Sequence, residues 1–383
     1  MAFNGHSLQY TNQPRMLINV QFLRVVAAML VVFYHTSAHV RDSGMDQGMF
    51  FALSEAIGFA GVDIFFVISG FIMAHTTHAA AGLEAGWAFA RRRIARIYCG
   101  YWPFFLLALA LFAWSDPARI QSSSLMRSAI LWPANELLIA VSWTLIFEMF
   151  FYVLYTLLVI FTSRRRNMAL QLLLAFIIGW SLFSQFGRHA YDPGHLEYIS
   201  LAEYYTVSPY LSEFLGGALV AGWLRHHQGG HGLVWLMLGT VLFCGAGWIN
   251  NHLFGGQLEQ GYHVFFRVLA FGVPAVMLVT GLVRLEQAGV RTPMRLSLLA
   301  GGASYAIYLS HTLLLTASQH LGLNAFAGQL GASPARLLLA LYTLLILLYS
   351  IAHYRLLERP LHRAFKQVLG LDRQRATGSD ANP

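Results

Sequence analysis

Long apolar blocks dominate this sequence and restrict what it can fold into. Soluble globular domains have about 25% charged residues, whereas this chain has 11%. A helix needs about 20 apolar residues to cross the hydrocarbon core of a membrane. The sequence therefore predicts an all-α polytopic membrane protein with about ten transmembrane helices. The blocks are 17–40, 56–76, 97–114, 141–162, 168–187, 204–224, 232–250, 262–283, 297–319 and 335–357.

The basic residues predict the direction of these helices. With the N-terminus in the cytoplasm, eighteen of the 25 Lys and Arg residues fall in cytoplasmic segments and five in external ones. Cytoplasmic loops of membrane proteins carry an excess of Lys and Arg. We therefore expect both termini to be cytoplasmic. The net charge of +8 then reflects topology, and no nucleic-acid partner is expected.

The blocks predict one membrane domain between short polar ends. We assign residues 1–16 to a cytoplasmic N-terminal segment, 17–366 to the transmembrane domain and 367–383 to a disordered cytoplasmic tail. The first block lacks a small-residue cleavage site, which favours a retained helix over a signal peptide. The two cysteines, Cys99 and Cys244, show no spacing typical of a metal site. We expect neither a metal nor a disulfide.

A few ionisable residues lie inside the blocks, where a charge costs at least about 2.5 kcal/mol at the bilayer centre. Arg24 and His35 are eleven residues apart, which places them on one helix face about 16 Å apart. Asp63 is expected at the depth of His35, where its carboxylate would fix the tautomer of the imidazole. The alternatives are a snorkelling arginine, a core histidine and a helix N-cap.

Three more ionisable residues are expected in the same polar layer. Glu148, Glu213 and His311 reach a comparable depth in the fourth, sixth and ninth blocks. We expect Glu148 to join the catalytic group, and Glu213 and His311 to bind substrate. Arg267 lies near the outer interface, where a snorkelling arginine is the simpler interpretation.

Four arginines precede the third block: Arg91, Arg92, Arg93 and Arg96. Guanidinium groups at this density suit a polyanion such as a nucleotide diphosphate, although topology alone also favours arginine here. Coenzyme A has a nucleotide head and a thin extended arm. We expect Arg92, Arg93 and Arg96 to bind its phosphates. The arm would then pass Arg24 and Ser69, since Gly70 beside Ser69 permits a close approach. His35 would deprotonate an acceptor hydroxyl or accept the acyl group itself.

Several motifs together resemble the acyltransferase-3 family of integral-membrane O-acyltransferases over about residues 17–362. They are residues 19–24 (NVQFLR) followed by Tyr34-His35, 61–71 (GVDIFFVISGF), 93–98 (RIARIY), 302–311 (GASYAIYLSH) and 357–360 (LERP). This resemblance implies that Arg24, His35, Arg93 and Arg96 are needed for activity.

Residues 143–152 (WTLIFEMFFY) are similar to the version in exopolysaccharide-acetylating members, such as succinoglycan acetyltransferases. The resemblance implies acetyl-CoA as donor and a sugar hydroxyl of a polysaccharide or lipid-linked oligosaccharide as acceptor. It also implies a bacterial inner-membrane location among lipids, with polysaccharide-assembly proteins as further candidate partners. Two departures are Cys99, where many members have proline, and Met149, which replaces a second acidic residue and leaves Glu148 alone.

Two other classes of function compete with an enzyme. A proton-coupled transporter or exporter of a saccharide or small anion would use His35, Asp63 and Glu148 as a relay. The dense arginine cluster and the absence of matching broken segments in two halves of the sequence argue against a transporter. A non-catalytic scaffold would leave the intramembrane charges unexplained.

Overall fold

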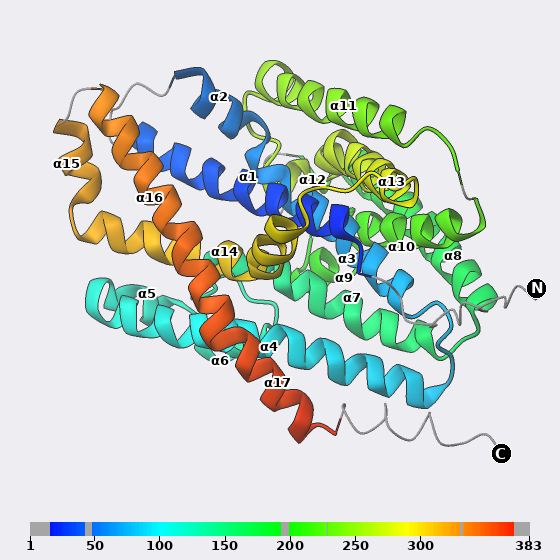
Figure 1. The fold of residues 1–383 in the computed structure, drawn as a ribbon. Coiled ribbons are helices and arrows are strands. Elements are labelled where there is room, and N and C mark those ends of the chain that lie inside the picture. Colours follow the sequence, from blue (N-terminus) through cyan, green and yellow to red (C-terminus); the bar gives the residue numbers. More distant parts are fainter. Residues whose placement is uncertain (1–15, 43–47, 193–198, 228, 330–331, 371–383) are drawn as a thin grey trace, which may run out of the picture.

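The computed structural model describes residues 16–42, 48–192, 199–227, 229–329 and 332–370 (Figure 1). The described residues are mostly helical, and none of them forms a strand. The terminal segments that we assigned to 1–16 and 367–383 lie mostly outside them. The helices are α1 (Ile18–Asp42), α2 (Gly48–Ile57), α3 (Gly61–Thr76), α4 (Leu83–Ser115), α5 (Pro117–Ser122), α6 (Leu125–Ile130), α7 (Trp143–Val159), α8 (Ser163–Leu182), α9 (Leu201–Thr206), α10 (Tyr210–His226), α11 (Gly232–Leu253), α12 (Val264–Arg267), α13 (Val273–Gln287), α14 (Met294–His320), α15 (Leu323–Gln329), α16 (Ala332–His353) and α17 (Arg359–Val368).

Within the described part of the chain, nine helical segments are long and apolar enough to cross a membrane. They are Ile18–Ser37, Gly48–Thr76, Leu83–Ser115, Ala140–Val159, Ser163–Gly187, Gly232–Leu253, Gly261–Gln287, Met294–His320 and Arg336–Val368. The block expected at 204–224 is not one continuous helix. The helix is interrupted between α9 and α10 next to Pro209, whose ring cannot continue a helix from the preceding turn. The remaining helix, α10, has 17 residues and packs inside the bundle.

Helix ends from the whole chain gather at one end of the bundle, which we call the basic end. The nitrogen of Gly82 donates to the carbonyl of Ile160 at 2.9 Å, which joins the start of α4 to the end of α7. Arg91 donates to the carbonyl of Leu369 at 3.2 Å, which brings the end of α17 to the same place. The nitrogens of Ile18 and Asn19 donate to Glu286, at the end of α13. The start of α1 and the end of α17 therefore lie at one end (Figure 1).

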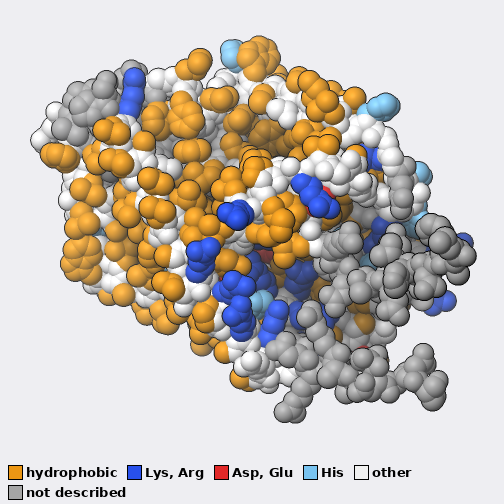
Figure 2. Space-filling view, in the orientation of Figure 1, with side chains coloured by type: hydrophobic (Ala, Val, Ile, Leu, Met, Phe, Trp, Pro, Cys, Tyr) orange, Lys and Arg blue, Asp and Glu red, His pale blue; other side chains and the backbone are white. Residues whose placement is uncertain are grey.

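The outer surface of the bundle is largely apolar. Figure 2 shows hydrophobic side chains over most of the visible face, and Lys and Arg side chains gathered around α17 and the start of α4. On α16 the exposed leucines include Leu337, Leu341 and Leu348. This distribution suits a helix bundle surrounded by lipid tails, with its cations at the level of the headgroups.

Glycines allow α3 and α10 to touch backbone to backbone in the centre of the bundle. A Cβ atom on Gly70 would lie 1.9 Å from the carbonyl oxygen of Phe214, and one on Gly217 would lie 2.0 Å from that of Val67. Small residues permit such close approach between membrane helices. Gly70 thus faces α10, and this contact fixes the position of α3, the helix that carries Asp63 and Ser69.

Candidate active site

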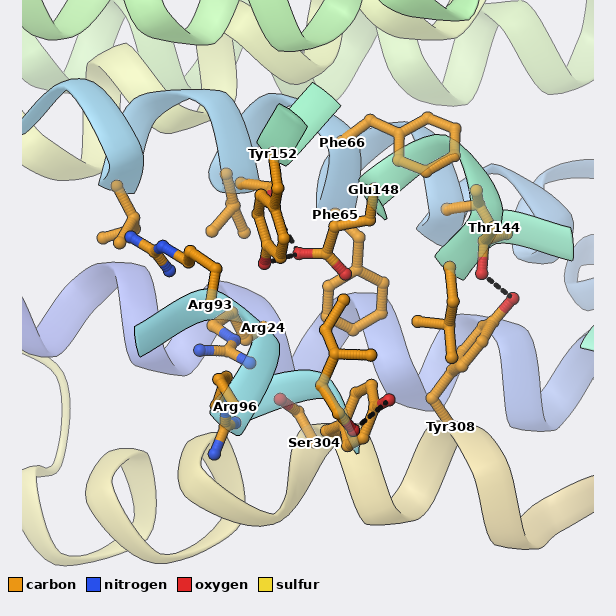
Figure 3. Close-up of a pocket in the computed structure, with 17 residues that line it drawn as sticks. Arg24, Phe65, Phe66, Arg93, Arg96, Thr144, Glu148, Tyr152, Ser304 and Tyr308 are labelled. Atoms are coloured by element: carbon orange, nitrogen blue, oxygen red, sulfur yellow. Dashed lines mark hydrogen bonds between the residues drawn. The ribbon is translucent and has the colours of Figure 1, made fainter. Parts of the chain in front are cut away.

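A cavity toward the basic end is enclosed by α1, α3, α4, α7 and α14, and we call it the arginine cavity (Figure 3). Its polar lining includes Arg24, Ser69, Arg93, Arg96, Glu148 and Tyr152. Three predicted donor-binding arginines and the predicted serine therefore meet in one place. In Figure 3 the arginines lie on one side of this cavity, and Thr144 and Tyr308 lie on the opposite side.

The helical spacing of α4 decides which arginines line the cavity. Arg93 and Arg96 are three residues apart and share a face, whereas Arg92 is exposed and is not part of the lining. Arg93 lies 5.1 Å from the ring centre of Phe89, and Arg96 donates to Glu358 at 3.0 Å. The predicted contact of Arg92 with a donor stays a prediction.

Glu148 belongs to the arginine cavity. Its carboxylate accepts a hydrogen bond from the Ser69 hydroxyl at 2.8 Å and another from the Tyr152 hydroxyl. The single polar layer that we expected from depth is therefore divided, since Glu148 and His35 line different cavities. Tyr152 was missed by the sequence analysis, although its spacing of four residues from Glu148 places both on one helix face.

A second cavity lies farther from the basic end, and we call it the histidine cavity. It is lined by polar and aromatic residues that include His35, Trp143, Tyr204, Tyr210, Glu259 and Arg267. Val62 and Tyr308 line both cavities, so the two cavities meet at these side chains. The Tyr308 hydroxyl donates to the carbonyl of Val141 and accepts from Thr144, both at 3.0 Å.

His35 of α1 lies beside His311 of α14, with Nδ1 of His35 3.3 Å from Nε2 of His311. Nδ1 of His35 is also 2.9 Å from the carbonyl of Val31, and Nδ1 of His311 is 3.3 Å from that of Ile307. Because a carbonyl only accepts hydrogen bonds, these contacts assign the proton to Nδ1 in both rings. The proton on Nδ1 of His35 is then shared between the carbonyl of Val31 and Nε2 of His311, and Nε2 of His35 carries the lone pair of a base.

Asp63 is held by Arg267. The guanidinium donates to both carboxylate oxygens, with contacts of 2.7 and 3.1 Å, and both side chains are buried. The interpretation of Arg267 as a snorkelling arginine was therefore wrong. Among the described contacts, His35 lies beside His311, and the predicted pairing of His35 with Asp63 finds no support. Asp63 was paired with His35 because the two residues were expected at a similar depth. The same argument would have paired Asp63 with Arg267.

Glu213 is buried next to this ion pair. It is 2% exposed, and its carboxyl oxygens find no hydrogen-bond partner among the residues that the structure describes. It packs against Gly272, where a Cβ atom would lie 2.5 Å from its Oε1. Glu213 lines neither cavity, so its predicted role in substrate binding gains no support. Across the described ranges, no three His, Cys, Asp or Glu side chains form a group able to hold a metal.

A helical membrane domain with a cationic cavity, a histidine cavity and a meeting point between them has the architecture of a membrane-embedded transferase. Residues 17–355 match the acyltransferase domain that defines the acyltransferase-3 family, and the chain belongs to this family. It is therefore an acyltransferase that transfers groups other than aminoacyl groups. This membership favours the enzyme over the transporter and the scaffold.

Two relatives agree with this family. The chain is 33% identical to the exopolysaccharide production protein ExoZ of Rhizobium meliloti (strain 1021) over 328 residues, which cover 80% of this chain and 90% of that protein. It is 27% identical to the acyltransferase MdmB of Streptomyces mycarofaciens over 391 residues, which cover 94% of each. No solved structure matches the chain.

Proposed function

We propose that this protein moves an acetyl group from cytoplasmic acetyl-CoA to a sugar hydroxyl of an exopolysaccharide or of its lipid-linked precursor. The observation that carries this proposal is the meeting of the arginine and histidine cavities at Val62 and Tyr308. An anionic donor and a hydroxyl acceptor can thus approach one point from opposite ends. The similarity to an exopolysaccharide production protein supports the choice of acceptor.

The basic end faces the cytoplasm in this proposal, and the membrane is the bacterial inner membrane. The excess of Lys and Arg at that end supports this orientation. Acetyl-CoA is made in the cytoplasm, whereas surface polysaccharides are assembled toward the outside. Transfer through the protein would then bring the acetyl group to the acceptor without moving coenzyme A across the bilayer.

The arginine cavity supplies the donor site in this scheme. Arg93 and Arg96 bind the diphosphate, because guanidinium groups present paired donors to phosphate oxygens. Arg24 lies deeper and guides the pantetheine arm past Ser69. Glu148 fixes Ser69 and Tyr152 by hydrogen bonds, which keeps the wall of the cavity in one arrangement. Its predicted catalytic role thereby becomes one of positioning.

His35 carries the chemistry. Its Nε2 removes the proton from the acceptor hydroxyl while that oxygen attacks the carbonyl carbon of the thioester. The carbon–sulfur bond breaks, and the sulfur leaves with the proton that His35 has taken. The products are an O-acetyl ester and coenzyme A with a free thiol. His311 accepts the hydrogen bond from Nδ1 of His35 throughout, so it orients the base and stabilises the imidazolium.

The test is the acetyl content of the polysaccharide, measured by proton NMR in a deletion strain. We expect wild type to restore the O-acetyl signal and His35→Ala to leave it absent at equal abundance in the membrane. Unchanged acetylation with reduced export of polymer would contradict an acetyltransferase. Full acetylation with His35→Ala would still support an acetyltransferase but would show that His35 is not its base.

A further inference from the structure

The histidine cavity contains polar groups that have no hydrogen-bond partner among the described residues. They are the carboxylate of Glu259, the indole nitrogen of Trp143 and the hydroxyl of Tyr204, and all three side chains are partly exposed. Glu259 lies in the segment between α11 and α12 and is only partly exposed. These groups are available to a ligand that both donates and accepts hydrogen bonds, as the hydroxyls of a sugar do.

Aromatic rings form much of the remaining wall. The ring centres of Trp143 and Tyr210 are 5.6 Å apart, and Tyr204 and Tyr205 meet edge to face at 5.4 Å. Ligand sites commonly combine apolar and aromatic walls with a few placed polar groups. A sugar ring fits such walls because its C–H face packs on an aromatic ring while its hydroxyls reach the polar tips.

The charge balance of the cavity selects among sugars. Of the described lining residues, Arg267 is the one with a permanent positive charge, and Asp63 neutralises it through the buried ion pair. Glu259 contributes a carboxylate to the same wall. A carboxylate on the acceptor would face Glu259 with no unpaired arginine or lysine to receive it, and like charges across an interface are strongly unfavourable.

We infer that the histidine cavity is a subsite for one neutral hexosyl residue of the acceptor, in which Glu259 accepts hydrogen bonds from sugar hydroxyls and excludes uronic acids. This inference rests on the proposed function and specifies its substrate. It assigns to Glu259 a role in selecting the acceptor. The donor site and the histidine pair do not depend on it.

The test compares two glycosides that differ in one carboxylate. Purified protein in detergent receives labelled acetyl-CoA with methyl β-D-glucoside or methyl β-D-glucuronide. For wild type we expect kcat/KM to be about 10-fold higher with the glucoside, as like-charge repulsion predicts. Glu259→Gln keeps the shape of the side chain and removes its charge. This substitution should raise kcat/KM for the glucuronide, so that the preference for the glucoside over the glucuronide falls severalfold. The KM for acetyl-CoA should be unchanged.

Glu136→Gln is the matched control, because Glu136 is an exposed carboxylate outside the lining of both cavities. It should leave both glycosides as in wild type. Equal use of the two glycosides by wild type, or an unchanged preference in Glu259→Gln, would overturn the inference. Acetylation of the polysaccharide with neither glycoside used would also overturn it, since the cavity would then not accept a single hexosyl ring. In each case acetylation in cells would still support the proposed function.

Discussion

At the scale of single residues, the imidazole of His35 lies beside a second imidazole, that of His311. His311 is fully buried, and its Nε2 lies 3.3 Å from Nδ1 of His35. The nearby carboxylate, Asp63, is committed to Arg267. The hydrogen bond to His311 fixes the orientation of the His35 ring.

Substitution of His311 separates positioning from substrate binding. We expect His311→Ala to lower kcat about 100-fold, because His35 loses the group that orients it, with the KM values for donor and acceptor little changed. His311→Gln should recover part of the rate, since its amide oxygen can replace Nε2 as acceptor. Steady-state kinetics of the three proteins in detergent would measure this. A raised KM for the acceptor with normal kcat would instead support the substrate-binding role predicted from the sequence.

Glu259 predicts a pH dependence of acceptor binding. Burial raises the pKa of Glu259 above its ordinary value, and the nearby Arg267 opposes part of this shift. A raised pKa means that Glu259 takes up a proton at a higher pH than an exposed glutamate, whose pKa is about 4.3. The KM for the glucoside should therefore rise as the pH falls toward the acidic range. Glu259→Gln should remove this rise, and a KM curve that keeps it would assign the titration to another group.

At the scale of helices, the contact between α3 and α10 fixes the frame of the site. Their backbones meet at Gly70 and Gly217, beside the segment of α3 that carries Asp63 and Ser69. Ser69 then reaches Glu148 on α7 at 2.8 Å. A displacement of α3 would thus disturb both the ion pair and the wall of the arginine cavity.

Gly70→Ala tests this contact. The added Cβ would meet the carbonyl oxygen of Phe214 at 1.9 Å, and a helix backbone cannot move aside as a flexible side chain can. Overpacking costs about 1–3 kcal/mol, and we expect the upper part of that range, seen as a lower thermal midpoint in detergent. Gly179→Ala is the control, since nothing lies within 4 Å of that position. It should be neutral or stabilising by up to about 1 kcal/mol. Equal midpoints for the two variants would contradict the close contact.

The helices were predictable from the apolar blocks, and their ends were less so. The block at 97–114 became a helix from Leu83 to Ser115, because a helix continues past the hydrocarbon core where apolar counting stops. Because of this extension the arginines lie on a helix. Arg93 and Arg96 face the arginine cavity, and Arg92 is exposed outside it. The block at 204–224 forms two helices that are separated at Pro209. A hydropathy profile alone does not detect such an interruption.

At the scale of the whole molecule, depth along each helix was a poor guide to which candidate residues lie together. Depth fixes one coordinate of a side chain, while rotation about the helix axis and the neighbours of each helix fix the others. His35 and Glu148 therefore line separate cavities. Glu259 carried no signal, because it lies between helices where neither periodicity nor hydropathy marks a residue. Its place in the histidine cavity depends on how distant segments fold together.

The arrangement of the two cavities predicts that the donor enters from one face of the membrane only. The arginine cavity lies toward the basic end, where Arg91 meets Leu369 and the start of α1 meets Glu286. If this end faces the cytoplasm, sealed inside-out vesicles should consume acetyl-CoA added to the medium, because a highly charged donor does not cross the bilayer. Sealed right-side-out vesicles should consume it only after permeabilisation, and His35→Ala vesicles give the background. Equal consumption by both kinds of sealed vesicle would refute a single donor entrance. Consumption by sealed right-side-out vesicles alone would place the basic end outside and reverse the direction of transfer.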